Sequence, residues 1–128
     1  MGLLSHAMVG WNDKDASLAF YNATFAALGV SGQTHDKGGF WGSPESGGFV
    51  LGQPRDGEPA THANGGTIGF TAPDTAAVDA WHAAGLANGG TCEGPPGLRE
   101  YGPAPMYGAY MRDPVGNKLC AFTINVGE

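Results

Sequence analysis

Two stretches of the chain place apolar residues at the spacing of one helical face. The first begins at Asp13, a good N-cap residue, and ends at Gly29, which suits the left-handed position after a helix. The second begins at Asp74 and ends at two glycines, residues 89–90. The predicted buried positions are Leu18, Tyr21, Phe25 and Leu28 in the first helix, and Val78 and Trp81 in the second.

A short strand-like run precedes each helix, over residues 3–10 and 67–71. The two N-caps differ by 61 (74 − 13), and the same offset separates Thr67 from His6 (67 − 6). A glycine-punctuated tail follows each helix, with room for three short strands in residues 30–65 and 91–126. Chance agreement of such markers is the alternative. The repeat predicts an α+β fold made of two tandem βαβββ modules, about residues 1–65 and 66–128, in one domain spanning residues 1–128.

The last two strands are predicted to form a hairpin. Pro114 presets φ for the turn, Asp113 can accept hydrogen bonds from the following backbone, and Gly116 tolerates positive φ. Residues 107–111 and 118–124 are therefore expected to pair. This is turn chemistry and indicates nothing about catalysis.

Composition narrows the class of protein. The 23 glycines lack the regular period of collagen, and thirteen aromatic residues favour a folded core over disorder. A net charge of −6 disfavours binding to nucleic acid or to an anionic membrane, and no apolar stretch is long enough to span a bilayer. Cys92 and Cys120 lack a CxxC spacing and are expected to be reduced thiols, so we expect a cytoplasmic protein.

Several segments resemble one known superfamily when taken in order. These segments are residues 4–13, 19–21, 28–30, 72–84, 94–99 and 112–119. Together they resemble the vicinal oxygen chelate superfamily, which contains the glyoxalases, the bleomycin-resistance proteins and the extradiol dioxygenases, and within it a glyoxalase-like bacterial branch. The resemblance implies βαβββ modules whose mixed sheets curve into a cup, with a divalent metal held by the first and last strands of each module.

Only part of the implied metal site is present. His6 matches the first-strand position, and alternation places it on the face opposite Ala7 and Val9. The corresponding position of the second module carries Thr67 where the family often has His. The last strand carries Cys120 where the family usually has Glu, and residues 47–52 offer no carboxylate or imidazole.

His6 and Cys120 therefore have two interpretations. They could act as catalytic residues and metal ligands, holding zinc, nickel, manganese or iron if His35, His62 or a tyrosine supplied a third donor. Cys120 could also be a nucleophile with His6 as its base. The other interpretation has no metal, with His6 as a hydrogen-bonded imidazole and Cys120 as a small apolar side chain.

Ligand-binding residues are expected in the glycine- and proline-rich segments that would form the rim. Trp41, Arg99, Tyr101 and Tyr107 offer one cation and aromatic faces, with Thr67 inside the cup, although the aromatic residues could instead fill space between the sheets. The favoured function is binding or transformation of a small organic ligand at a degenerate metal site. The alternatives are a metal-dependent lyase or isomerase of lactoylglutathione lyase type, with Glu45 or Glu100 as base, and a drug-sequestering binder that encloses an aromatic or cationic ligand. A homodimer and a small-molecule ligand are the expected partners.

Overall fold

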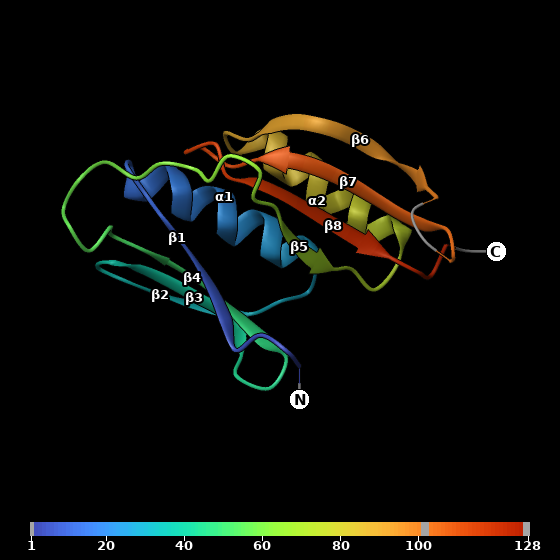
Figure 1. The fold of residues 1–128 in the computed structure, drawn as a ribbon, viewed down its shortest axis with the longest axis horizontal. Helices are drawn as coiled ribbons and strands as arrows, with labels where there is room; N and C mark the ends of the chain where they lie inside the picture. The colour runs from blue at the N-terminus through green and yellow to red at the C-terminus, as the bar shows by residue number, and fades with distance from the viewer. Residues whose placement is uncertain (1, 101–102, 127–128) are drawn as a thin grey trace.

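A computed structural model describes residues 2–100 and 103–126, and its ribbon is drawn in Figure 1. Each half of the chain runs strand, helix and three strands. The first half consists of β1 (His6–Gly10), α1 (Lys14–Ala27), β2 (Gly32–His35), β3 (Gly38–Ser43) and β4 (Gly47–Gly52). The second consists of β5 (Ile68–Thr71), α2 (Thr75–Ala87), β6 (Thr91–Arg99), β7 (Met106–Arg112) and β8 (Lys118–Thr123). The predicted tandem βαβββ fold is confirmed.

The strands form two separate four-stranded mixed sheets, with orders β1-β4-β3-β2 and β5-β8-β7-β6. In each, the first strand of the module pairs in parallel with the last, and the remaining pairs are antiparallel. The helices α1 and α2 pack against each other, and α2 lies behind the second sheet in Figure 1. Within the described residues, no helix is both long and apolar enough to cross a bilayer.

The helix boundaries follow the predicted caps. The Asp13 carboxylate accepts a hydrogen bond from the Ala16 amide at 3.1 Å, and Asp74 accepts one from the Ala77 amide at 2.9 Å. Gly29 and Gly89 adopt positive φ beyond the helix ends, at 76° and 95°. Both predicted helices are therefore confirmed.

The repeat offset of 61 holds for the helices, which begin at residues 14 and 75, but fails in the tails. The last strands begin at residues 47 and 118, a difference of 71. Most of the extra length lies in β6, a nine-residue strand with two irregularities in its pairing to β7, and in the longer connection between β6 and β7. Cys92 lies in β6, and the first strand begins at His6 rather than at residue 3, which corrects the expected start.

Aromatic side chains hold the two modules together. Tyr21 and Phe25 of α1 pack on Trp41 and Phe49 of the first sheet, with ring centroids 4.8 to 6.0 Å apart. Phe70 of β5 contacts Phe25 edge-on at 5.0 Å, which extends this cluster into the second module. Burial of these rings supplies much of the hydrophobic stabilisation of the fold.

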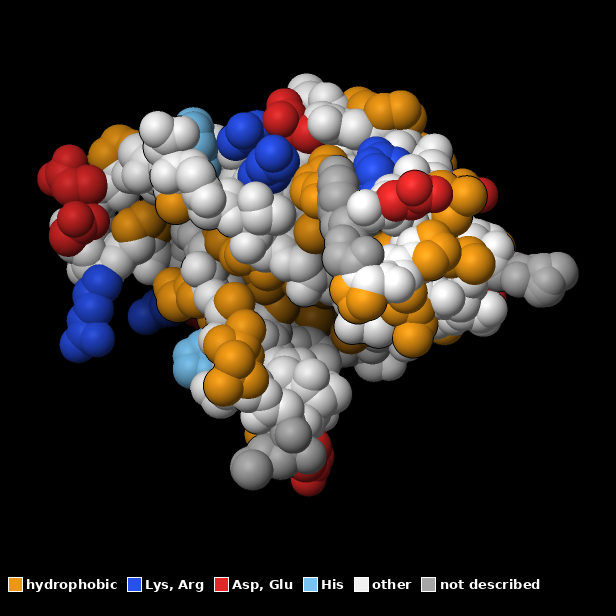
Figure 2. All heavy atoms as spheres, turned by 45° about the vertical axis from the view of Figure 1, so that its right-hand side comes forward, with side chains coloured by type: hydrophobic (Ala, Val, Ile, Leu, Met, Phe, Trp, Pro, Cys, Tyr) orange, Lys and Arg blue, Asp and Glu red, His pale blue; other side chains and the backbone are white. Residues whose placement is uncertain are grey.

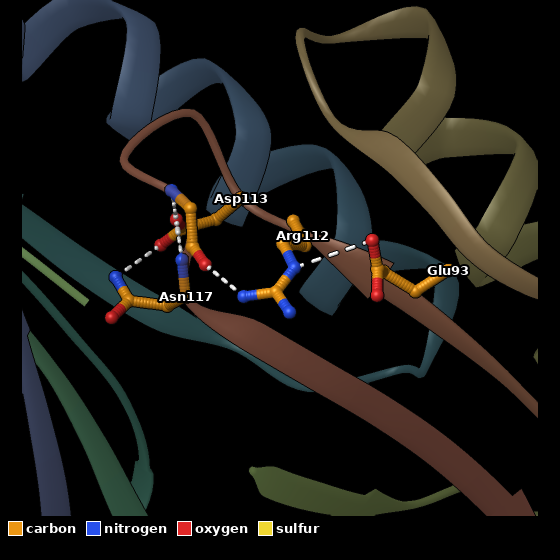
Figure 3. A network of polar contacts seen from close by, with 5 residues as sticks. Glu93, Arg112, Asp113 and Asn117 are labelled. Atoms are coloured by element: carbon orange, nitrogen blue, oxygen red, sulfur yellow. Dashed lines mark hydrogen bonds and ion pairs between the residues drawn. The ribbon is translucent and has the colours of Figure 1, made fainter. Parts of the chain in front are cut away.

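A polar contact also joins the modules. The hydroxyl of Tyr21 donates to the Asp113 carboxylate at 2.5 Å, deep in the structure. Asp113 also accepts bonds from the amides of Val115, Gly116 and Asn117 and from the Asn117 side chain, at 2.9 to 3.0 Å (Figure 3). The predicted β7–β8 turn is confirmed, and its aspartate also anchors α1.

Candidate functional site

The second sheet has one face packed on α2 and one open face. Leu119 and Ala121 are fully buried on the α2 side, so alternation along β8 places Cys120 on the other side. Residues paired across the strands form two rows on this open face. We call the open face the second-sheet face. The rows are Gly69, Cys120, Tyr110 and Gly94, and Thr71, Phe122, Gly108 and Gly97.

A cavity of about 520 Å³ lies over part of this face. Its walls come from β5, β7, β8 and the residues after β8, and they include Thr71, Met106, Tyr110, Phe122 and Asn125. Tyr110 and Phe122 meet edge-on with centroids 5.5 Å apart. The volume lies in the range of sites for small organic ligands, and the lining combines aromatic faces with a few polar groups.

Glycine at position 108 creates the space for this aromatic pair. A Cβ at Gly108 would lie 2.4 Å from the Phe122 ring, too close for any side chain without movement of the ring. Gly69 similarly leaves room for Cys120, since a Cβ there would lie 3.2 Å from its Sγ. The glycines on this face therefore serve the shape of the cavity as well as the turns predicted from composition.

Cationic side chains flank Tyr110 on both neighbouring strands. The Arg99 guanidinium carbon lies 6.0 Å from the ring centroid, and the Lys118 Nζ lies 5.2 Å from it. Arg112 lies two residues after Tyr110 on β7. It forms an ion pair with Glu93 at 3.3 Å and donates a hydrogen bond to the Gly116 carbonyl at 2.8 Å, as Figure 3 shows.

The two proposed catalytic and metal-binding residues belong to different sheets. His6 is exposed on β1 and lies 2.9 Å from the Ser5 hydroxyl through Nδ1. Cys120 is 8 % exposed, and burial raises the pKa of its thiol despite the opposing charge of Lys118. A protonated thiol is a poor metal ligand and a poor nucleophile.

The donor set does not fit a divalent metal within one chain. Throughout residues 2–100 and 103–126 there is no group of three or more His, Cys, Asp or Glu side chains that could hold one. The family position on the second module is Thr67, which is exposed just before β5. His35, whose Nδ1 accepts a hydrogen bond from the Lys37 amide at 3.2 Å, belongs to no such group either.

The predicted ligand-binding residues separate into three groups. Arg99 and Thr67 lie on the open side of the second sheet, Thr67 beside the polar pocket that includes Lys118. Trp41 is 2 % exposed in the core, and Tyr107 points to the α2 side, where its hydroxyl donates to Asp79 at 2.6 Å. The expected rim placement of Tyr107 is therefore wrong, whereas Trp41, although buried, lines a second cavity of about 510 Å³, and Tyr101 lies outside the described residues.

Three residues of the second-sheet face were missed from the sequence: Tyr110, Lys118 and Phe122. The signal was available, because residues two positions from Cys120 on a strand share its face. Tyr110 follows from the predicted hairpin, which pairs it with Cys120. The search for metal ligands drew attention to Cys120 alone.

Comparison with known proteins agrees with the fold. The family model of the glyoxalase/bleomycin resistance protein/dioxygenase superfamily matches residues 3–121. A crystal structure of a glyoxalase/bleomycin resistance protein from Albidiferax ferrireducens T118 is 48% identical, with a TM-score of 0.89 over 95% of this chain and 99% of that chain. No curated protein matches.

More distant structures show how far the similarity extends. A lactoylglutathione lyase from Agrobacterium tumefaciens is 25% identical, with a TM-score of 0.62 over 96% of this chain and 94% of that one. A glyoxalase/bleomycin resistance protein/dioxygenase family enzyme from Burkholderia phytofirmans PsJN shares the fold. It is 17% identical, with a TM-score of 0.68 over 94% of this chain and 97% of that one. The match over residues 3–121 establishes that the chain belongs to the glyoxalase/bleomycin resistance protein/dioxygenase superfamily.

Proposed function

We propose that the protein binds a small organic molecule on the second-sheet face without a metal ion. The observation that carries this proposal is the cavity of about 520 Å³ at the Tyr110–Phe122 pair. The donor identities support the absence of metal chemistry, because Thr67 and a buried, protonated Cys120 stand where the superfamily often has His and Glu. Cytoplasmic localisation stays a prediction from the sequence.

We also propose that a second copy of the chain covers this cavity. β1 and β5 are edge strands of separate sheets, and unpaired strand edges favour association. The β1 side carries exposed apolar side chains, with Leu3, Leu4 and Met8 at 98, 65 and 53 % exposure. A twofold dimer would place the His6 face of one copy over the second-sheet face of the other.

Binding is tested by a thermal-shift screen of aromatic, anionic, cationic and glutathione-like compounds, with wild-type protein and a Tyr110→Ala variant. Hits that raise the wild-type Tm and leave the variant unchanged support the site. Hits that stabilise both proteins equally contradict it. A Leu86→Ala variant is a matched control, because Leu86 is 44 % exposed on α2, away from the cavity.

The dimer is tested by sedimentation of wild-type protein and a Met8→Glu variant. A charge at this exposed edge position should dissociate the dimer, whereas Leu86→Glu on α2 should not. A monomeric wild-type protein at high micromolar concentration would contradict this part of the proposal.

The second candidate is a metal-dependent lyase, favoured by the 25% identity to the Agrobacterium tumefaciens lactoylglutathione lyase. Elemental analysis of protein purified without chelators, then calorimetric titration with zinc, nickel, manganese and ferrous iron, decides between the two. Stoichiometric binding that is lost in His6→Ala or Cys120→Ala would establish the metal site and refute the metal-free proposal. Metal binding by the wild-type protein that is no stronger than binding by those variants would support the metal-free proposal.

A further inference from the structure

The positive charges of the chain are unevenly placed. Six Lys and Arg stand against twelve Asp and Glu, yet three of the six, Arg99, Arg112 and Lys118, lie on the open side of the second sheet. Figure 2 shows some of the Lys and Arg side chains in the upper part of the molecule, with apolar and acidic side chains beside them, and others at the lower left. None of the three lines the cavity itself, but Arg99 and Lys118 flank Tyr110, which is one of its lining residues.

Arg99 is held in place by its own strand. Its guanidinium donates to the carbonyls of Gly97 and Pro95, both at 2.9 Å. It lies across Gly94 and Gly97, since a Cβ at either glycine would be 3.1 or 3.2 Å from a guanidinium nitrogen. These bonds fix its orientation and leave its charge uncompensated, because carbonyl oxygens carry no net charge.

Lys118 brings a second charge to the same aromatic ring. Its Nζ and the Arg99 guanidinium lie 5.2 and 6.0 Å from the Tyr110 centroid, so the two groups are at most 11.2 Å apart, the sum of these distances. Both cations therefore lie beside this ring, so a small molecule whose apolar body lies on Tyr110 and Phe122 can place an anionic group next to either of them. Ion pairing is strengthened where an apolar wall excludes water.

Among residues 2–100 and 103–126, Arg99 and Lys118 form no ion pair with an acidic side chain. Glu93 pairs with Arg112 at 3.3 Å, and this is the one Lys or Arg ion pair found among the described residues. Asp113 binds the β7–β8 turn and Tyr21, as described above. Within the described part of the chain, Arg99 and Lys118 are thus cations without an acidic ion-pair partner.

We infer that the second-sheet face recognises a small organic anion, with a carboxylate or similar oxyanion carried on an apolar or aromatic body. Arg99 and Lys118 bind the anionic group, and Tyr110 and Phe122 contact the body. This inference rests on the proposed function, since it names the ligand class for the same cavity. It differs from the drug-sequestering alternative, in which the enclosed ligand was expected to be aromatic or cationic.

Three probes with the same naphthyl body separate the charge from the body: 2-naphthoate, 2-naphthamide and 2-naphthylmethylammonium. Their dissociation constants are measured by titration of amide NMR signals, which also locate the bound probe. We expect 2-naphthoate to bind about tenfold more tightly than the amide, with the ammonium weakest, at low ionic strength. Raising salt from about 20 mM to about 500 mM should reduce the preference, because ions screen the charges.

Variants assign the preference to the two side chains. Arg99→Gln and Lys118→Gln should each reduce the naphthoate-to-naphthamide ratio roughly threefold or more, and the double variant should abolish it. Arg55→Gln is the matched control, because Arg55 is an exposed cation in the segment between β4 and β5. Circular dichroism and urea titration confirm that each variant is folded.

The outcomes separate this inference from the proposed function. If 2-naphthamide or the ammonium binds at the cavity as tightly as 2-naphthoate, the cavity is a ligand site and the anion inference is wrong. The inference is also wrong if Arg55→Gln reduces the preference as much as Arg99→Gln does. If no probe shifts the signals of the second-sheet face, the proposed function fails as well.

Discussion

Removing one hydroxyl, in Tyr21→Phe, tests the polar contact between the modules. The Tyr21 side chain is fully buried and donates to Asp113 at 2.5 Å, so the variant deletes a hydrogen bond to a carboxylate and keeps the ring. Such bonds contribute about 1.5 to 3 kcal/mol. Asp113 retains its three backbone donors and the Asn117 side chain, so no charge is left unsatisfied. We therefore expect a loss near the lower end, about 1.5 to 2 kcal/mol.

The pH dependence gives an independent signature. Burial raises the pKa of Tyr21 well above its ordinary value of 10.0, and the nearby Asp113 carboxylate adds to the effect. A pKa that is higher in the folded state means that this stabilisation is complete below about pH 10 and declines as pH rises toward the folded pKa. The wild-type protein should lose stability above about pH 10, and Tyr21→Phe should lose less over the same interval.

The assay is urea denaturation at pH 7 and at pH 10.5, with Tyr107→Phe as the matched control. Tyr107 also donates to a carboxylate, that of Asp79 at 2.6 Å, but at a more exposed position. Solvent screening should keep the loss in the control below about 1 kcal/mol. Equal losses in the two variants, or no loss in Tyr21→Phe at pH 7, would refute the claim that this contact couples the modules.

The remaining predictions concern the thiols, the core and the caps. Cys92 is exposed, whereas Cys120 is buried with a raised pKa, so a disulfide reagent should modify Cys92 at least about tenfold faster, and Cys92→Ser should leave only the slow phase. Trp41→Phe should lower the free energy of unfolding by about 1 to 3 kcal/mol without altering affinity for 2-naphthoate, because Trp41 belongs to the core. A changed affinity would show that Trp41 contributes to ligand binding. Asp74→Ala should cost about 1 kcal/mol in urea denaturation through loss of the N-cap, and an unchanged midpoint would contradict that assignment.

The helices and the last turn were predictable because their signals are local. Asp13, Asp74 and Gly29 act through bonds and dihedral angles within a few residues, so their chemistry is visible in sequence order. The strand boundaries in residues 91–126 were less predictable. Glycine and proline in residues 94–97 indicate a loop, whereas pairing with β7 makes this segment part of β6.

The candidate site was only partly predictable, because side-chain direction depends on which face of a sheet a helix covers. The assignment of Trp41 and Tyr107 to the rim rested on the composition of their segments and not on the alternation of side chains along a strand. Arg99 was identified as a cation near the rim. Its orientation comes from backbone carbonyls and from glycines 94 and 97, which sequence order does not bring together.

The most direct test of the central claim is a titration of isotopically labelled protein with 2-naphthoate, followed by amide NMR. Binding on the second-sheet face should shift the signals of Gly69, Thr71, Gly108 and Tyr110, which line the open rows of β5 and β7. The signals of β2 and β3 should stay unchanged. Saturable shifts confined to the second-sheet face would support a ligand site there, and shifts confined to the first sheet, or none, would contradict it.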